Sequence, residues 1–327
     1  MSRFRTSLRP LLSIVIIAAT GYFFFRAFRR NWASVRAHEF QIAPLYLTLA
    51  VSAAIVTTML ATFAWQLAIN KLSKREPIDF RQSIATVNAS GLTKYIPGKV
   101  WSYALQMYWL NRLGISKGLI VYVNLVNQLI SMGMAVALGL GCLLLSSSSF
   151  PRHLALATLV GLLMLDACCV IFNRAILNGL ILLVNRLSKK KFGYFEVTKR
   201  VLFELHAVHL LAAVTYGLSA SLCCLGVGYE LPPGRALLVV AASLLSEVGG
   251  FLAIVVPGGL GVREGLMYTL LGGAAGGSLT LILPVASRVM NMGVDVLLGL
   301  VALRLLRTLA TSKNVVPLPE GESNAAP

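Results

Sequence analysis

The chain has 327 residues, of which 57% are hydrophobic and only 13% are charged, and its mean hydropathy is +0.77. A soluble domain carries about 25% charged residues, so this composition excludes a large soluble domain and predicts a multi-pass membrane protein. The net charge of +17 fits lysines and arginines that orient the protein and contact anionic lipid headgroups, and we expect no nucleic-acid partner.

The apolar runs are continuous rather than alternating, which favours membrane helices over a β-barrel. The first run follows three arginines and ends in an aromatic cluster, Tyr22 to Phe25. We interpret it as an uncleaved first helix, because cleavage at the small residues inside it would leave that cluster at a new terminus. In chain order, the expected spanning helices are 10–28, 44–69, 119–145, 153–173, 204–228 and 280–303.

Two further apolar segments, 82–111 and 236–276, are each interrupted by a Pro-Gly motif. The first motif begins at Lys94 and reads KYIPGKVW, and the second begins at Val255 and reads VVPGGLGVRE. The arms on either side are too short for two comfortable spans, so we expect each segment to be a re-entrant helical hairpin. Paired breaks at corresponding places in two halves indicate a transporter-type site near the membrane midplane.

The distribution of basic residues supports this arrangement. With a cytoplasmic N-terminus and both hairpins re-entrant, 19 of the 29 lysines and arginines fall on the cytoplasmic side and six on the outer side. This excess agrees with the positive-inside rule. The first hairpin then enters from the cytoplasm and the second from outside. Spacing supports such inverted halves, since 53 residues separate Pro44 from Pro97 and 53 separate Glu204 from Pro257.

The predicted fold class is therefore all-α: a polytopic membrane protein with about six spanning helices plus two re-entrant helical hairpins in an inverted repeat. We expect one membrane domain over residues 1–312, with halves of about 1–150 and 151–312, and a disordered cytoplasmic tail over 313–327. The predicted location is a bacterial inner membrane, with both termini in the cytoplasm.

The helix that follows each hairpin carries three polar residues at matching offsets. Offsets of 0, 3 and 7 place each trio on one helical face, and the match supports a repeat. The trios are Asn124, Asn127 and Ser131 in the first half and Arg288, Asn291 and Asp295 in the second.

The two breaks form the candidate binding site. Pro and Gly free backbone N–H and C=O groups that must pair with protein, water or substrate inside a membrane, and the N-terminal ends of half-helices suit phosphate. We expect Lys94, Lys99 and Arg263, together with hairpin N–H groups, to hold phosphate. The simpler alternative is a plain loop with glycines for close packing. Three glycines would let a ligand approach the backbone: Gly258, Gly259 and Gly261.

Carboxylates inside apolar segments are costly and usually face the protein interior with a partner. Glu247, Glu264 and Asp295 are expected to bind an amine or hydroxyls, or to carry coupling protons. Arg288 and Asn291 share a helix face with Asp295 and join the candidate set. We expect the charges beside the breaks to face one shared polar cavity. The alternative is a structural salt bridge of Arg288 with Asp295 or Glu247.

No pattern of a catalytic centre or a cofactor site accompanies these charges. His206 and His209 lie beside Glu204, where packing at the membrane interface is a better interpretation than a metal site. The five cysteines lie in apolar segments without metal-ligand spacing. We therefore expect no catalytic residues, no metal and no cofactor.

The two Pro-Gly motifs together resemble a known family. KYIPGKVWS followed by VPGGLGVREG is similar to the flippase-like membrane region of the lysylphosphatidylglycerol synthases, the bacterial multiple peptide resistance factors, over about residues 5–310. The resemblance implies a bundle with re-entrant helices that moves a polar lipid headgroup between leaflets. No soluble aminoacyl-transfer domain follows the last helix, so we do not expect synthesis of lysylphosphatidylglycerol. The resemblance carries over Lys94, Pro97, Gly98, Lys99 and Trp101 in the first motif, and Pro257, Gly258, Gly259, Gly261 and Glu264 in the second.

The leading functional hypothesis is a flippase-like lipid transporter. Its cargo would be an anionic or zwitterionic phospholipid or a polyprenyl-phosphate-linked sugar. A second hypothesis is a non-transporting membrane partner of a glycosyltransferase or lipid synthase, and a third is a membrane-embedded transferase. The expected partners are therefore membrane lipids, above all anionic or polyprenyl-phosphate lipids, and a glycosyltransferase or synthase.

Overall fold

The computed structural model describes residues 29, 41–73, 77–95, 101–146, 151–171, 179, 182, 186, 197–253, 256–272 and 278–311. All regular secondary structure in these residues is helical, which confirms the predicted all-α polytopic membrane fold. The expected helix 10–28 and tail 313–327 lie outside the described residues. Five described helices are long and apolar enough to cross a membrane: α3 (Pro44–Leu72), α6 (Lys117–Leu145), α9 (Lys199–Gly226), α10 (Pro233–Leu252) and α12 (Leu279–Thr311).

One helix differs from the sequence-based expectation in length, whereas α7 (Arg152–Ile171, 20 residues) forms where a span was expected at 153–173. α10 has 20 residues, a rise of about 30 Å, which is enough to cross the bilayer core. The expectation of a short first arm in the second hairpin is therefore wrong. Pro233 explains the extra length, because proline is well accommodated at the first helical position.

The two halves of the chain repeat one order of elements. In the first half, α3 is followed by α4 (Phe80–Gly91), the 3₁₀ turn η1 (Leu92–Tyr95), α5 (Trp101–Asn111) and α6. In the second half, α9 is followed by α10, the 3₁₀ turn η2 (Pro257–Gly259), α11 (Val262–Gly272) and α12. Because α4 packs against α5 and α10 against α11, each interrupted segment is a helical hairpin.

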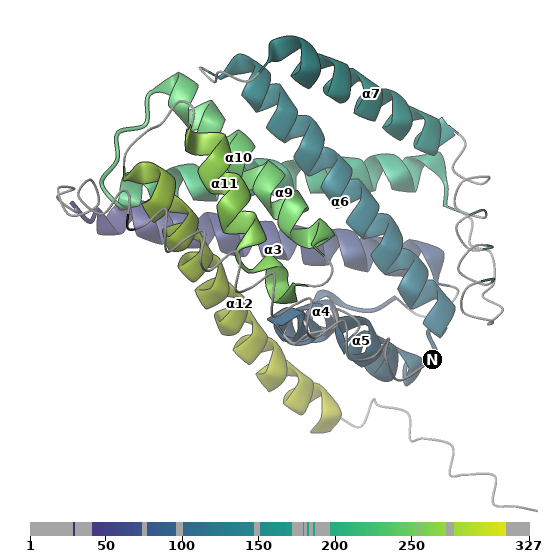
Figure 1. The fold of residues 1–327 in the computed structure, drawn as a ribbon. Coiled ribbons are helices and arrows are strands. Elements are labelled where there is room, and N and C mark those ends of the chain that lie inside the picture. Colours follow the sequence, from purple (N-terminus) through teal and green to yellow (C-terminus); the bar gives the residue numbers. More distant parts are fainter. Residues whose placement is uncertain are drawn as a thin grey trace, which may run out of the picture.

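Packing between the halves is reciprocal (Figure 1). α3 packs along α9, while α4 packs on α12 and α10 packs on α6. Each hairpin therefore lies against the closing helix of the other half, and η1 contacts η2. α7 lies beside α6 at one edge of the bundle. The exchange of hairpins is what brings η1, the turn that precedes the first Pro-Gly motif, against η2.

The second hairpin begins and ends on the same side of the bundle. The Tyr229 hydroxyl, in the connection between α9 and α10, donates a hydrogen bond to Ser278 Oγ, just before α12, at 2.6 Å. A segment whose two ends are in contact fits a re-entrant hairpin, although its orientation in the membrane stays a prediction. In the first hairpin, the N-terminus of α4 is fixed by a capping box that Asp79 forms with Gln82.

The bundle is held by two large apolar clusters. One joins α3, α5, α6 and the first turns of α9, and the other joins α6, α9, α10, α11 and α12. Large apolar side chains such as Phe203 and Val289 remain exposed on the outside of the bundle, as expected where helices face lipid. The charged residues of the second hairpin lie among the helices of the second cluster.

Candidate functional site

The second Pro-Gly motif turns the chain through three glycines in the left-handed region. Gly258, Gly259 and Gly261 have φ angles of 57°, 66° and 82°, which residues with a Cβ rarely adopt. Gly259 also packs tightly on α10, since a Cβ there would lie 2.6 Å from the Gly250 carbonyl oxygen. Gly259 therefore serves close packing, as the simpler sequence interpretation proposed for the glycines, and holds the break against α10.

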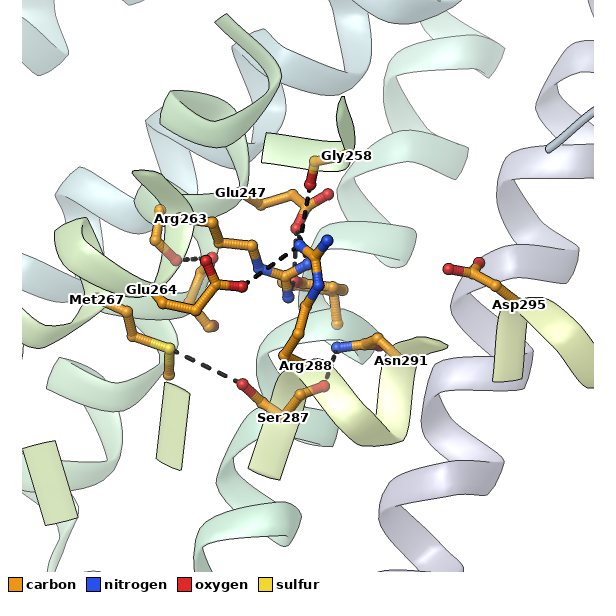
Figure 2. A network of polar contacts seen from close by, with 12 residues as sticks. Glu247, Gly258, Arg263, Glu264, Met267, Ser287, Arg288, Asn291 and Asp295 are labelled. Atoms are coloured by element: carbon orange, nitrogen blue, oxygen red, sulfur yellow. Dashed lines mark hydrogen bonds and ion pairs between the residues drawn. The ribbon is translucent and has the colours of Figure 1, made fainter. Parts of the chain in front are cut away.

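Arg263 and Glu247 form the first ion pair beside this break (Figure 2). Arg263 Nη1 lies 2.6 Å from Glu247 Oε2, which joins α11 to α10. Tyr216 on α9 completes the group, because its hydroxyl donates to Glu247 Oε2 at 2.9 Å and accepts a hydrogen bond from Arg263 Nη2. The Arg263 side chain is 12% exposed and that of Glu247 is 48% exposed. The Glu247 carboxylate is therefore the open end of this group.

Glu264 and Arg288 form a second ion pair that is more deeply buried. Arg288 Nη1 on α12 lies 3.4 Å from Glu264 Oε1 on α11, and both side chains are 10% exposed. The same Nη1 donates a hydrogen bond to the Gly258 carbonyl at 2.9 Å. Glu264 Oε2 accepts a hydrogen bond from the Gly261 N–H at 2.5 Å. The pair therefore ties the closing helix α12 to backbone groups that the break has freed (Figure 2).

Lys94 and Asp295 form a third ion pair, which joins the two halves. Lys94 Nζ, in η1 of the first hairpin, lies 2.7 Å from Asp295 Oδ2 on α12. Asp295 lies to one side of the Arg288 network in Figure 2. Arg288 thus pairs with Glu264, and not with Asp295 or Glu247 as the structural alternative from sequence proposed.

Three other predicted residues lie in α5, η2 and α12. Trp101 is the first residue of α5 and is 52% exposed. Pro257 begins η2. Asn291 uses its amide to donate to the Ser287 carbonyl in its own helix at 2.8 Å. The polar trio of α12 therefore does not act as one unit, since its members contact a hairpin, their own helix and the other half.

The remaining predicted residues of the first motif, Pro97, Gly98 and Lys99, lie outside the described residues. The structure brings Glu247, Arg263 and Glu264 to one place beside the second break, while the shared polar cavity expected from sequence stays a prediction. The contribution of the first break to that grouping stays a prediction, apart from Lys94.

The first hairpin carries an uncharged counterpart of the Arg288 contact. Gln106 on α5 donates through Nε2 to Ser90 Oγ on α4 at 3.0 Å, and its Oε1 accepts from Asn124 Nδ2 on α6 at 2.7 Å. Asn124 and Arg288 are the first members of the polar trios of the two closing helices. Each closing helix therefore reaches its own hairpin through the first residue of its trio, with amides in one half and ions in the other.

Sequence reasoning overlooked Tyr216 and Gln106. Tyr216 lies well inside a 28-residue span, whereas tyrosines of membrane proteins concentrate at the interfaces. Gln106 is a buried amide in an otherwise apolar arm, 5% exposed. Both are polar groups far from a helix end, and that position is the signal that could have identified them.

The second break places arginine and glutamate side chains beside backbone N–H and C=O groups of the turn. Guanidinium groups bind phosphate in a fixed fork geometry, and carboxylates accept hydrogen bonds from amines or hydroxyls. Among the described residues, no group of three or more His, Cys, Asp and Glu side chains is placed to hold a metal ion. The chemistry that this arrangement supports is binding of an anionic or zwitterionic headgroup.

A family model agrees with this description. The model for the lysylphosphatidylglycerol synthase TM region matches residues 11–299, which include both hairpins. The match confirms the family resemblance seen in the two Pro-Gly motifs. No curated protein matches the chain.

Proposed function

The protein belongs to the lysylphosphatidylglycerol synthase TM-region family, and we propose that it is a flippase-like transporter that moves a phosphate-bearing lipid headgroup across a bacterial inner membrane. The cargo is a phospholipid or a polyprenyl-phosphate-linked lipid. The protein moves this lipid without chemical change, and both of its termini lie in the cytoplasm.

The charge network at the second break is the observation that carries this proposal. Its four ionised side chains lie on α10, α11 and α12, and two of these helices are long enough to span a bilayer. An ionised group at the helix centre costs about 3 kcal/mol on insertion scales. Apolar residues of similar volume often stabilise a fold as well as a buried ion pair does. Charges kept at such a place therefore favour a role in moving polar cargo.

The arrangement suggests how a headgroup crosses while its acyl chains remain in lipid. Glu247 is the half-exposed carboxylate of the network and meets the amine or hydroxyls of a headgroup first. A cation behind it receives the phosphate. The Lys94–Asp295 pair links the first hairpin to the second half, so a rocking motion of one half against the other changes the side from which the network is reached.

Translocation in proteoliposomes tests this function. Fluorescently tagged phosphatidylglycerol, phosphatidylethanolamine, phosphatidylcholine and a polyprenyl phosphate are placed in the vesicles, and a membrane-impermeant quencher reports transfer between leaflets. A tagged glucosyl diacylglycerol, which has no phosphate, is the control lipid. We expect faster transfer of at least one phosphate-bearing lipid than in protein-free vesicles. Protein that is folded by its melting curve and moves none of these lipids would contradict the proposal.

The alternative function, a non-transporting membrane partner, predicts a different result. The intact protein would move no lipid and would co-purify with a glycosyltransferase or lipid synthase. Co-purification from the native membrane, measured beside the transport assay, separates the two functions.

A further inference from the structure

Arg288 keeps a positive charge inside the bundle with only one of its three nitrogens engaged. The residue is 8% exposed. Its Nη1 contacts both the Gly258 carbonyl and the Glu264 carboxylate. Its Nε and Nη2 are buried and have no hydrogen-bond partner in the described part of the chain. A charged side chain is therefore held at the break with donor groups to spare.

The two unused nitrogens form a matched pair. Nε–H and one N–H of Nη2 point in parallel along a single edge of the planar guanidinium, and this edge fits two oxygens of a phosphate or carboxylate. A buried donor without a partner costs about 1–3 kcal/mol, and more when it is charged. Two such donors on the same edge are therefore better explained by a ligand than by helix packing.

We propose that the free edge of Arg288 is a bidentate subsite for the phosphate oxyanion of a lipid headgroup. The inference rests on the proposed function for the source of the phosphate, and it identifies which cation receives it. Lys94 and Arg263 are less suited, because each already has a carboxylate oxygen within 2.7 Å.

The surroundings of Arg288 suit reversible binding of an anion. Glu264 Oε1 is also buried without a hydrogen-bond partner among the described residues. Its 3.4 Å separation from Arg288 Nη1 exceeds the usual 2.7–2.9 Å of a charge-assisted hydrogen bond by about half an ångström. Glu264 therefore balances the charge of Arg288 without occupying the free edge. The guanidinium lies beside the N-terminal end of the 11-residue helix α11, whose dipole also favours an anion.

Equilibrium binding to the purified full chain in detergent tests the subsite without requiring transport. The probe is dihexanoyl phosphatidylglycerol, titrated by calorimetry. Arg288→Lys keeps the charge beside Glu264 but removes the planar edge. Arg152→Lys, the same change at an exposed residue at the start of α7, is the matched control. We expect Arg288→Lys to bind at least about tenfold more weakly than the wild type and Arg152→Lys to bind as the wild type does. Equal affinity in folded Arg288→Lys protein would overturn the proposal.

Two further probes make the wild-type protein informative by itself. Inorganic phosphate that competes with the lipid supports a phosphate subsite open to either source, and binding of the lipid alone supports a subsite that also needs the acyl chains. A short-chain glucosyl diacylglycerol that binds as tightly as phosphatidylglycerol overturns the proposal, because the affinity would then not depend on phosphate. If Arg288→Lys and a second variant, Arg288→Gln, both fail to fold, this comparison of the two lipids on the wild-type protein is the test of the proposal.

The binding and transport results are separable. Phosphate-dependent binding that is lost in Arg288→Lys, in a protein that moves no lipid, would leave the subsite standing and refute the transporter. Transport by the wild type together with unchanged lipid binding in Arg288→Lys would refute the subsite alone.

Discussion

The two ion pairs at the second break differ in burial, and that difference separates their roles. Glu264 and Arg288 are each 10% exposed, while Glu247, the partner of Arg263, is 48% exposed. Removal of one partner from a buried pair leaves an uncompensated charge and destabilises by about 3–5 kcal/mol. In the other pair only Glu247 is open, and without its charge the 12% exposed Arg263 still donates a hydrogen bond to the Tyr216 hydroxyl. We therefore expect Glu264 to matter more for stability, and Glu247 to be the carboxylate that a ligand can reach.

We expect Glu264→Gln to lower the melting temperature in detergent clearly more than Glu247→Gln does. Both changes remove one negative charge and keep the shape of the side chain, so each serves as the control for the other. The reason is that the Arg288–Glu264 ion pair is buried, whereas water or a lipid headgroup can take the place of the Glu247 carboxylate beside Arg263. Equal losses in the two variants would contradict the distinction.

At this scale the sequence indicated which charges matter but not how they pair. Glu247, Arg263, Glu264, Arg288 and Asp295 are all recognisable as costly charges inside apolar segments. Their partners depend on how the hairpins pack, and this tertiary information is absent from local periodicity. The partner of Asp295 comes from the other half of the chain. The Tyr216 contact likewise links helices that are distant in sequence.

At the scale of elements, the break between α10 and α11 depends on backbone freedom at η2. Gly259 combines a φ of 66° with direct contact on Gly250 of α10. The sequence predicted this interruption from its Pro-Gly motif, and it predicted most helices within a few residues. It placed the start of α10 too late, because the three residues from Pro233 to Arg235 were interpreted as loop and not as a first helical turn.

We expect Gly259→Ala to destabilise the protein by about 1–3 kcal/mol, through backbone strain and the clash with the Gly250 carbonyl. Gly265→Ala is the matched control, because Gly265 lies inside α11 and a Cβ added there would have nothing within 4 Å. Alanine favours a helix interior over glycine, so Gly265→Ala should be neutral or slightly stabilising. The measurement is a melting curve of each variant, and a wild-type curve for Gly259→Ala would contradict the role assigned to the break.

At the scale of the whole molecule, each hairpin packs on the closing helix of the other half. The exchange accompanies the similar order of elements in the two halves, and it places η1 against η2. The sequence suggested the repeat through equal spacings, but it could not show the exchange, which is a property of packing. The Lys94–Asp295 pair lies where the two halves meet, and in repeat-built transporters such an interface is the usual place of a transport site.

The packing of α6 on α10 predicts a specific cross-link between the halves. A Cβ at Gly139 would lie 3.4 Å from the Leu244 Cβ, close to the spacing of a disulfide. We expect the pair Gly139→Cys and Leu244→Cys to form a disulfide under mild oxidation in a chain freed of its five native cysteines. The pair Gly141→Cys and Leu244→Cys should not, because nothing lies within 4 Å of a Cβ at Gly141. Cross-linking of both pairs to the same extent would contradict this packing.

The orientation of the hairpins predicts the sides from which two exposed residues are labelled. Lys117 follows the first hairpin and Glu230 precedes the second. In the inverted repeat, Lys117→Cys reacts with a membrane-impermeant maleimide only from the cytoplasmic side, and Glu230→Cys reacts only from outside. Labelling of both residues from one side would rule out hairpins of opposite orientation.

Lipid translocation by Glu247→Gln tests most directly whether the charges at the second break handle a headgroup. The assay compares this variant with the wild type and with Glu230→Gln, the same change at an exposed residue between α9 and α10. We predict that Glu247→Gln slows transfer of the transported lipid at least about tenfold, the equivalent of about 1.4 kcal/mol, with a melting temperature close to that of the wild type, and that Glu230→Gln has no effect. Wild-type transport by Glu247→Gln would contradict a role for this network in moving lipid.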